Sequence, residues 1–517
     1  MTDGANPAPP AIGRLLQSRA RISPTMCAVA ADGAPRVTFA ELETRSNRLA
    51  HHLAGMGIKH GDRVGLLVPN GLAFIEFFFA LAKLGAVTCA LNNRLAAAEL
   101  VPIMRDSELA LAVIHPSFAD LTEAALTDLA IPVMSTETTD WPSGLPDTPL
   151  VVDVQATDTL LLVYTSGTTG RPKAVMITHD QMFWASLTMT ASLDFRLGDV
   201  HLLPAPMFHV GGLSFICHCV HLGITLMVPT RWNAERVAQL IEQEKVDHFF
   251  AVPTMLLDLL DKGGESIAGR LRSVRWILTG AAPTPPSLIR RYAAFDIPVM
   301  QSYGATETCG PGLFVDQAHA VDKAGAVGRP FFHTELRLVS DDGTCSKTDE
   351  PGELQLRGQH IFAGYRNDPE ATQQAFTPDG WLRTGDIGRQ DADGFVHLID
   401  RGKNLIISGG ENIYPREVEQ VLEAHPAVRE VAVVGLPDVR WGERLTALVV
   451  LKSRSSTNES ELLAFCTGLL ARYKVPKALF IVESLPLNAT GKLIRQQVQE
   501  LAMVLSEESL PKRSGEI

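Results

Sequence analysis

The chain has 517 residues, of which 46% are hydrophobic, and it carries a formal net charge of −12 with a pI near 5.7. This hydrophobic content is typical of a globular protein, and the length predicts roughly three to four folding units, or one large domain with a small one. The acidic balance argues against nucleic acid as a partner, because binding a phosphate backbone needs a basic face.

The cysteines and the apolar segments indicate where the protein resides. Seven cysteines, at positions 27, 89, 217, 219, 309, 345 and 466, are scattered and odd in number, which predicts reduced thiols and a cytoplasmic location. No secretory signal is visible in residues 1–10. The most apolar stretch, residues 74–87, is too short to span a bilayer and contains Glu76 and Lys83. We therefore expect a buried helix and no membrane span, with peripheral association left open.

In chain order, the first third of the sequence alternates between predicted helices and strands. Thr38 and Glu41 form a capping box ahead of a helix, and a strand (64–68), a helix (73–84) and a strand (86–90) follow. The alternation continues to about residue 134, which predicts a mainly parallel sheet covered by helices.

After a linker rich in Thr, Asp and Pro at residues 136–149, alternation resumes and later changes character. Beyond Gly328, shorter strands separated by turns predict an antiparallel or β-barrel-like subdomain, and residues 400–403 are typical of a hinge. From residue 404 onward we expect a small α+β domain. The predicted class is thus α/β, with a large N-terminal domain of mainly parallel sheets and a small C-terminal domain.

Residues 164–174, Tyr-Thr-Ser-Gly-Thr-Thr-Gly-Arg-Pro-Lys-Ala, form a polar loop between two apolar runs. Glycines let backbone N–H groups approach an anion, hydroxyls donate further hydrogen bonds, and Lys173 adds charge, so the loop can hold phosphates. It is not a Walker A loop, because Pro172 precedes Lys173 and Ala174 takes the hydroxyl position. Composition alone leaves a flexible surface turn as an equal alternative.

Three further motifs are each weak alone: Tyr303-Gly-Ala-Thr-Glu307 after a strand, Trp381-Leu-Arg-Thr-Gly-Asp386 in a predicted turn, and Pro486-Leu-Asn-Ala-Thr-Gly-Lys492. In this order with the phosphate loop, they resemble the adenylate-forming acyl-CoA synthetases, a superfamily shared with carrier-loading adenylation domains and beetle luciferases. The resemblance covers essentially the whole chain and looks strongest to bacterial fatty-acyl and aryl-acid CoA ligases. It implies ATP, Mg²⁺ and coenzyme A, an N-terminal domain of residues 1–400, a hinge at 401–403 and a mobile C-terminal domain of residues 404–517.

The resemblance also implies, position by position, where the nucleotide binds. The residues expected to contact ATP or AMP are Thr165, Ser166, Gly167, Thr168, Thr169, Gly170, Lys173, Gly280, Ala281, Ala282, Pro283, Ser302, Tyr303, Gly304, Ala305, Thr306, Asp386 and Arg401. Asp386 would accept hydrogen bonds from both ribose hydroxyls, and Glu307, a hard oxygen ligand, would bind Mg²⁺. The residues expected to act in catalysis are Lys492, His209, Thr306 and Glu307, with Lys492 bridging the substrate carboxylate and the α-phosphate.

One site must serve two reactions, so the family rotates its C-terminal domain between steps, with Lys403 at the pivot position. The residues expected to face CoA are Ser408, Gly409, Gly410, Glu411, Trp441 and Lys474. Paired glycines permit close backbone approach, although outside this context an ordinary tight turn is the more usual interpretation. The residues expected to line the acyl pocket are Phe208, His209, Gly211, Gly212, Cys217 and Gly310.

A second interpretation exists for Cys217, His218, Cys219 and His221, which together suggest a metal site. The segment is apolar and helical, and only Cys217 and His221 share a helix face, so lining the acyl pocket is favoured. Three positions depart from the family pattern, Ala174, Asn404 and Leu487, and none removes a group that the chemistry requires.

The expected function is therefore an ATP-dependent ligase that joins an apolar carboxylic acid, fatty, aryl or alicyclic, to CoA through an acyl adenylate. Two alternatives remain open: an acyl-AMP ligase that loads a carrier protein, and a catalytically silent nucleotide-binding regulator. The first is disfavoured because the sequence shows no appended carrier segment. The second is disfavoured because a silent regulator would be expected to lose at least one of Lys492, Glu307 and Asp386, and all three are present. The sequence leaves the acid and the choice between monomer and homodimer open.

Overall fold

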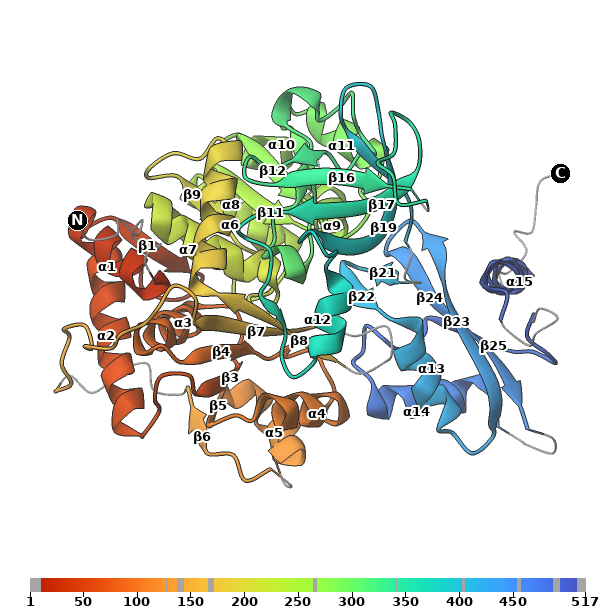
Figure 1. Ribbon diagram of the computed structural model, residues 1–517, viewed down its shortest axis with the longest axis horizontal. Helices are drawn as coiled ribbons and strands as arrows, with labels where there is room; N and C mark the ends of the chain where they lie inside the picture. The colour runs from red at the N-terminus through yellow and green to blue at the C-terminus, as the bar shows by residue number, and fades with distance from the viewer. Residues whose placement is uncertain are drawn as a thin grey trace. The chain divides into compact units, whose positions relative to one another are not determined.

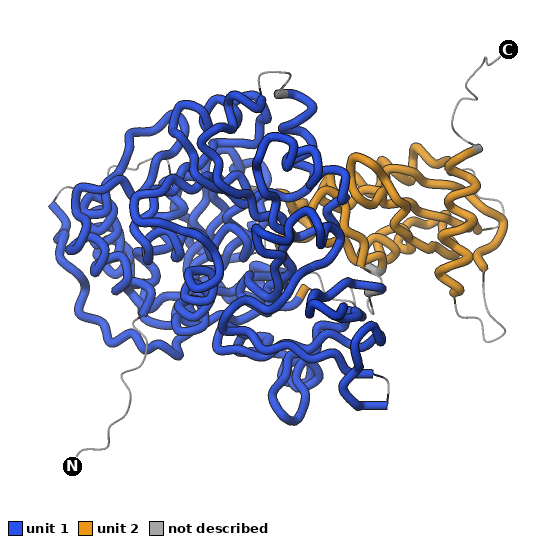
Figure 2. The backbone as a smooth tube through the Cα atoms, turned by 90° about the horizontal axis from the view of Figure 1, so that it is seen from above, with its two compact units in different colours: residues 1–93, 101–165, 173–402 blue, residues 94–100, 166–172, 403–517 orange. Residues whose placement is uncertain are grey.

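The structure is a computed structural model that describes residues 11–126, 129–136, 144–165, 172–263, 267–340, 342–401, 405–452, 457–486 and 493–508. The chain divides into two compact units, which Figure 2 colours separately. Unit 1 comprises residues 1–93, 101–165 and 173–402, and unit 2 comprises residues 94–100, 166–172 and 403–517. The expected hinge function of residues 401–403 stays a prediction.

A seven-stranded sheet in unit 1 has the order β18-β8-β7-β4-β3-β5-β6. Its strands are β3 (Arg63–Leu67), β4 (Val87–Ala90), β5 (Leu111–Ile114), β6 (Val133–Ser135), β7 (Thr159–Thr165), β8 (Lys173–Thr178) and β18 (Gly364–Tyr365). Strands β6, β5, β3, β4 and β7 are parallel, which confirms the prediction from alternating helices and strands. The β7–β8 and β8–β18 pairs are antiparallel, a direction that hydrophobic runs alone do not encode.

A nine-stranded sheet forms the second layer of strands in unit 1, in the order β15-β14-β13-β12-β11-β9-β10-β1-β2 (Figure 1). Its strands are β1 (Cys27–Ala31), β2 (Val37–Thr38), β9 (Val200–Leu202), β10 (Thr225–Val228), β11 (His248–Ala251), β12 (Trp276–Thr279), β13 (Val299–Tyr303), β14 (Leu313–Phe314) and β15 (Arg329–Pro330). From β1 to β13 the neighbours are parallel, so their carboxyl ends meet at one edge. Ligand-binding loops of open α/β sheets lie at that edge.

The helices before residue 376 are α1 (Ile12–Ile22), α2 (Phe39–Gly55), α3 (Leu72–Leu84), α4 (Ala97–Ser107), α5 (Ala119–Leu126), α6 (His179–Ser192), α7 (Val210–Leu222), α8 (Ala234–Glu244), α9 (Pro253–Gly263), α10 (Ile267–Arg270), α11 (Pro286–Ala293) and α12 (Pro369–Ala375). One buried cluster joins both sheets through the helices between them; it includes Leu226 and Leu161 from the sheets and Leu16, Phe77 and Leu213 from α1, α3 and α7. A second cluster packs α8, α9 and α11 against the other face of the nine-stranded sheet. Unit 1 is therefore built in layers of helices and strands.

Helix α3 is buried almost all round, as the apolar run predicted. Its two charged residues are neutralised by helix α2: Glu76 pairs with Arg45, and the Lys83 ammonium lies 2.6 Å from the Glu43 carboxylate. Buried charges need such partners, because removing an unpaired ion from water costs on the order of several kcal/mol. Within the described parts of the chain, no helix is both long and apolar enough to cross a membrane.

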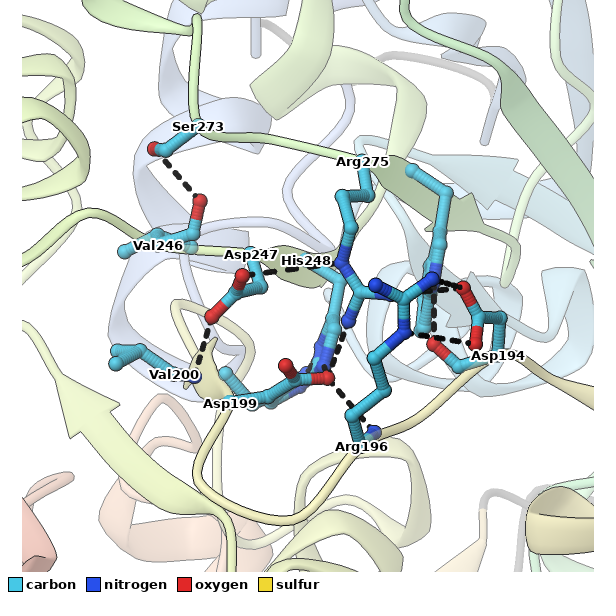
Figure 3. A network of polar contacts seen from close by, with 11 residues as sticks. Asp194, Arg196, Asp199, Val200, Val246, Asp247, His248, Ser273 and Arg275 are labelled. Carbon is cyan, nitrogen blue, oxygen red and sulfur yellow. Dashed lines mark hydrogen bonds and ion pairs between the residues drawn. The ribbon is translucent and has the colours of Figure 1, made fainter.

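A network of charges ties together the amino ends of parallel strands β9, β11 and β12 (Figure 3). The Asp199 carboxylate, just before β9, accepts from His248 Nε2 at 3.1 Å and pairs with Arg275, just before β12. The Val200 N–H donates to Asp247 at 2.8 Å. These contacts hold the amino ends of the strands together, at the edge opposite the carboxyl ends where open α/β sheets bind ligands.

Four antiparallel strands form the subdomain that was expected to be barrel-like: β16 (Glu335–Val339), β17 (Gly352–Arg357), β19 (Leu382–Gln390) and β20 (Val396–Arg401). They confirm the short antiparallel strands that were expected beyond Gly328. The predicted turn at residues 381–386 is wrong, because Leu382 to Asp386 belong to β19. The strand is irregular there: its register against β17 shifts and Gly385 has a φ of 74°, so a bulge produced the turn-like signal.

Unit 2 contains a five-stranded sheet of β21 (Ile406–Ser408), β22 (Glu411–Ile413), β23 (Val428–Asp438), β24 (Gly442–Leu451) and β25 (Ala478–Ile481). Its helices after residue 403 are α13 (Pro415–Glu423), α14 (Glu459–Leu469) and α15 (Arg495–Glu508). Helix α15 was not predicted, since its sequence is mostly polar. It buries Val498 and Ala502 against β23 and β24, and this tertiary packing stabilises a weakly patterned helix.

Candidate active site

The phosphate-loop candidate joins two hydrogen-bonded strands. Thr165, the last residue of β7, pairs with Lys173, the first residue of β8. The Thr165 hydroxyl lies 3.5 Å from the Lys173 carbonyl oxygen. The loop candidates Ser166, Gly167, Thr168, Thr169 and Gly170 lie outside the described residues. The described structure therefore places the two ends of the loop side by side.

The adenine-wall candidates follow β12 and end β13, at the carboxyl edge of the nine-stranded sheet. Gly280 comes directly after β12, and a Cβ at this position would lie 2.7 Å from Ser302 Oγ and 2.8 Å from the Ser302 carbonyl oxygen. Ser302 Oγ also donates to the Thr279 carbonyl at 3.0 Å. The structure thus brings Gly280 and Ser302 together, and only a glycine permits this approach without displacement. Ala281 has a φ of +64°, and Ala282 and Pro283 continue the same turn.

The turn after β13 is tightly folded. A Cβ on Gly304 would lie 1.7 Å from the Gly310 carbonyl oxygen, and the Ala305 N–H donates to Thr308 Oγ1 at 2.9 Å. A short 3₁₀ helix, Thr306–Thr308, starts immediately afterwards and carries Glu307. Because the chain returns to Gly304 at Gly310, the position of Thr306 and Glu307 between them is fixed.

Two nucleotide-site candidates 83 residues apart form a direct hydrogen bond. The Tyr303 hydroxyl donates to Asp386 Oδ2 at 2.5 Å. Asp386 in β19 also stands opposite Arg401 in the β19–β20 register; the Arg401 side chain lies outside the described residues. The bulge in β19 presents Asp386 to Tyr303, so the end of β13 and the antiparallel sheet meet at one site.

The Glu307 carboxylate is held by a residue that the sequence analysis did not select. The Tyr365 hydroxyl donates to Glu307 Oε1 at 2.7 Å, and the Phe362 N–H donates to the Glu307 carbonyl at 2.9 Å. The Lys173 ammonium lies 5.0 Å from the centre of the Tyr365 ring. Only the Gly364-Tyr365 pair could have drawn attention to this segment, and such a pair is common.

The acyl-pocket candidates gather around the start of α7. His209 stands directly before this helix, and its ring centre lies 4.6 Å from that of Phe208. Gly211 is half-buried, and a Cβ there would lie 3.4 Å from the Phe250 ring. Gly310 has a φ of +112°, and a Cβ at this position would lie 3.3 Å from Ser214 Oγ of α7. The structure therefore places Gly310 against the helix that carries Gly211.

Two other acyl-pocket candidates face the protein interior. A Cβ on Gly212 would lie 2.3 Å from the Pro206 carbonyl oxygen, so this glycine serves close packing. Cys217 is fully buried, and burial raises the pKa of its thiol. The described residues include no group of three or more His, Cys, Asp or Glu side chains that could hold a metal ion. In particular, His221 Nδ1 lies 3.0 Å from Ser186 Oγ.

Four CoA-contact candidates in unit 2 form a hairpin turn. Ser408 ends β21 and Glu411 starts β22, and the two pair across the ladder. Gly409 and Gly410 have φ values of 64° and 85°, the geometry of a two-residue hairpin that favours glycine. The Gly409 N–H donates to the Trp441 carbonyl at 2.8 Å, and a Cβ on Gly409 would lie 3.0 Å from the Trp441 ring. The paired glycines and Trp441 are thus neighbours.

The lysine candidates of unit 2 differ in how far the structure describes them. Lys474 is only 3% exposed, and its ammonium lies 2.6 Å from the Glu417 carboxylate. This lysine is therefore engaged inside the unit. Lys403 and Lys492 lie outside the described residues.

Comparison with known proteins assigns this chain to a family. The profile described as AMP-binding enzyme matches residues 16–366, and that of the AMP-binding enzyme C-terminal domain matches residues 417–492. The chain belongs to the AMP-binding enzyme family. The resemblance to adenylate-forming acyl-CoA synthetases that the motifs indicated is thereby confirmed.

Relatives of this AMP-binding enzyme align with it over nearly their whole length. The long-chain-fatty-acid–CoA ligase FadD13 of Mycobacterium tuberculosis is 38% identical over 500 residues, which cover 95% of this chain and 98% of that protein. A feruloyl-CoA synthase of Amycolatopsis is 38% identical over 482 residues, covering 93% and 97%. A solved structure of the o-succinylbenzoate CoA synthetase of Bacillus subtilis, a double mutant bound to a product analogue, has a TM-score of 0.87 and 33% identity, covering 94% of this chain and 98% of that one.

The described residues of the AMP-binding enzyme fit a magnesium ion held mainly by its substrate. Glu307 offers one carboxylate with its Oε1 already hydrogen-bonded. Mg²⁺ typically takes one or two protein carboxylates and completes its octahedron with phosphate oxygens and water. A single carboxylate oriented by a hydrogen bond fits that donor set.

Proposed function

We propose that this AMP-binding enzyme is an ATP-dependent carboxylic acid–CoA ligase. It would form an acyl adenylate and pyrophosphate from an acid and ATP, and then acyl-CoA and AMP from the adenylate and coenzyme A. The observation that carries the proposal is similarity over 95% of the chain to an enzyme named as a CoA ligase. The hydrogen bond between Tyr303 and Asp386 supports the proposal. Because Tyr303 and Glu307 belong to the same short motif, this bond brings the nucleotide candidates close to the metal candidate.

In the first step two anions must meet, a carboxylate and a triphosphate, so charge neutralisation is the main catalytic task. We assign Lys173 and the loop of residues 165–170 to the β- and γ-phosphates and Lys492 to the bridge between the acid and the α-phosphate. Asp386 would accept hydrogen bonds from the ribose hydroxyls. Glu307 would hold Mg²⁺, which supplies further positive charge beside the phosphates when bound.

The adenine and the α-phosphate would be held by the turns at the carboxyl edge of the nine-stranded sheet. We assign Gly280 to Pro283, Ser302 and Tyr303 to the walls of the adenine site. Thr306 would contact the α-phosphate, with Gly304 and Ala305 fixing the turn, and Arg401 would reach the ribose or the phosphate. His209 would stand between the nucleotide and the acid.

The acid that we propose is apolar: a fatty, aryl or alicyclic acid. The named relatives act on a long-chain fatty acid, on ferulic acid and on succinylbenzoate. In this chain Gly211 and Gly310 permit close approach at α7: a Cβ on Gly211 would lie 3.4 Å from the Phe250 ring, and one on Gly310 would lie 3.3 Å from Ser214 Oγ. An aromatic wall of this kind suits an alkyl chain or a ring.

For the second step we assign CoA to the C-terminal domain, beside the hairpin of Ser408 to Glu411 and Trp441. The glycines would admit the pantetheine close to the backbone, and Lys403 would be the pivot of a domain rotation between steps. Lys474 serves this site less directly than the sequence suggested, because it is buried against Glu417.

The experiment that tests the proposal measures pyrophosphate release and thioester formation, with and without CoA, across a panel of fatty, aryl and alicyclic acids. We expect slow, acid-dependent pyrophosphate release without CoA and multiple turnover with it. A carrier-loading acyl-AMP ligase would form the adenylate but no CoA thioester. A silent nucleotide-binding regulator would release no pyrophosphate with any acid.

A first prediction concerns Lys492. Lys492→Ala should lower acyl-AMP formation by at least roughly a hundredfold, because one positive charge at the reacting centre is lost. Thioester formation from supplied acyl-AMP should remain within about twofold, because the amine is assigned to the first step only. The matched control is Lys452→Ala. The Lys452 ammonium donates to the Pro426 carbonyl in unit 2. Equal loss of both half-reactions would contradict the assignment.

We also propose a cytoplasmic enzyme, because all seven cysteines are free and both ATP and CoA are available there. The choice between monomer and homodimer is tested directly by light scattering of the purified chain.

A further inference from the structure

Tyr365 lies in the short strand β18, which the backbone fastens to the strand that starts at Lys173. Tyr365 pairs with Val175 and Gly364 with Met176 in the antiparallel β18–β8 ladder. The Arg366 N–H donates to the Ala174 carbonyl at 2.9 Å. Because these contacts are all within unit 1, the place of Tyr365 beside the beginning of β8 is fixed by the sheet itself.

From this place the Tyr365 side chain contacts two groups that the proposed function needs. Its hydroxyl donates to Glu307 Oε1 at 2.7 Å, and its ring centre lies 5.0 Å from the Lys173 ammonium. The same segment also holds the backbone of Glu307, since the Phe362 N–H donates to the Glu307 carbonyl at 2.9 Å. The Phe362 ring packs edge-on against Tyr365 at 4.9 Å, which restricts the tyrosine ring.

These two contacts act in different ways. A phenol that donates to one carboxylate oxygen fixes the plane of the carboxylate and leaves the other oxygen for a cation. Partners of this kind are known to set the affinity of metal-binding carboxylates. The ring face, which carries partial negative charge, attracts the ammonium of Lys173 and limits where it can move. The Tyr365 side chain therefore restricts both the Glu307 carboxylate, which follows β13, and the Lys173 ammonium at the start of β8.

We infer that Tyr365 is a positioning residue for adenylate formation, which orients the Glu307 carboxylate for the metal ion and holds the Lys173 ammonium beside the phosphate loop. This inference rests on the proposed function of Glu307 and Lys173. Tyr365 itself takes no part in bond making or breaking, and it contributes nothing to the transfer of the acyl group to CoA.

Tyr365→Phe removes the hydroxyl and keeps the ring, so it tests the contact with Glu307 alone. The matched control is Tyr292→Phe in α11, whose hydroxyl donates to the Leu256 carbonyl at 2.8 Å, a hydrogen bond of structural use only. Binding of Mn²⁺, a paramagnetic substitute for Mg²⁺, is measured by electron paramagnetic resonance on the full chain with a non-reacting methylene analogue of ATP. This readout requires no turnover.

We expect Tyr365→Phe to weaken Mn²⁺ binding about tenfold and Tyr292→Phe to leave it unchanged, as for other partners of metal-binding carboxylates. In a Glu307→Gln background, adding Tyr365→Phe should have no further effect, because its target has lost its charge. Mn²⁺ affinity within about twofold of the parent in Tyr365→Phe, or a full additional loss in the Glu307→Gln background, would overturn the inference.

Tyr365→Leu tests the ring. Relative to Tyr365→Phe, it should weaken binding of the ATP analogue without metal by a further three- to fivefold (roughly), the effect of losing an exposed cation–π contact. Adenylate formation should fall in both variants, whereas thioester formation from supplied acyl-AMP should stay within about twofold. A comparable fall in both half-reactions would assign Tyr365 a structural role only. Failure of the parent protein to form any adenylate would instead contradict the proposed function and leave the metal titration as an independent test of Tyr365.

Discussion

Three buried histidines of unit 1 remain neutral in the folded protein. Burial lowers the pKa of His179 to about 4, of His218 to about 3 and of His360 to about 4. His179 shows what this neutrality serves, because its Nδ1 accepts the Ile12 N–H at 3.1 Å and so joins the start of α1 to α6. Protonation at Nδ1 would remove that acceptor.

These pKa values predict that acid destabilises the protein. Below the ordinary histidine pKa of about 6.5, the unfolded chain binds protons that the folded chain does not, so the free energy of unfolding falls as the pH falls. His218 alone should account for about 2 kcal/mol between pH 7 and pH 5. His218→Leu should therefore show a shallower pH dependence in urea unfolding at pH 7, 6 and 5. An unchanged slope for His218→Leu would contradict the prediction.

Residue pairs far apart in sequence were the part of the site that could not be predicted. The motifs selected Tyr303 and Asp386 one by one, but their hydrogen bond joins β13 to β19 across 83 residues, and no local pattern encodes that contact. Tyr365 was missed altogether, because its contact with Glu307 spans 58 residues and requires the β18–β8 pairing. Motifs recover residue types, whereas partners follow from tertiary register.

At the scale of elements, prediction succeeded where hydrophobic pattern and end signals agree. The capping box predicted at Thr38 is present, with the Glu41 N–H donating to Thr38 Oγ1 at 3.2 Å, and α3 begins one residue before its predicted start. The antiparallel pairing of β7 with β8 could not be predicted, because two buried apolar runs in the sequence do not indicate the relative direction of the strands. Helix α15 was missed because polar residues surround its short apolar face, of which Val498 and Ala502 are buried in the folded unit.

The turn after β13 yields a prediction about one glycine. Gly304→Ala should abolish binding of an ATP analogue, because the new Cβ would lie 1.7 Å from the Gly310 carbonyl oxygen and the turn carrying Thr306 and Glu307 must move. The control is Gly269→Ala in α10, where a Cβ has no atom within 4 Å; it should keep full affinity. Isothermal titration calorimetry measures both, and tight binding by Gly304→Ala would contradict the assignment of this turn.

At the scale of the whole molecule, four hydrophobic clusters formed by described residues each belong to one unit. Two clusters lie in unit 1, and two others, which include Ile406, Val433 and Val498, lie in unit 2. Separate cores predict separate cooperativity, because a unit with its own buried apolar surface can fold by itself.

We therefore expect a fragment of residues 1–402 to fold, to bind the ATP analogue and to form no acyl adenylate, since it lacks Lys492. In scanning calorimetry the full chain should show two transitions, and the analogue should raise only the one that the fragment shares. A single transition, shifted as a whole by the analogue, would indicate that the two units unfold together.

The pairing of Thr165 with Lys173 has a consequence for engineering. The core ends at this rung of the ladder, so both anchors of the intervening segment are held by the sheet whatever residues connect them. An insertion between the anchors leaves every side chain of β7 and β8 on its own face, whereas an insertion within either strand would reverse them. We therefore expect exchange of the segment between Thr165 and Lys173 to leave β7 and β8 in register.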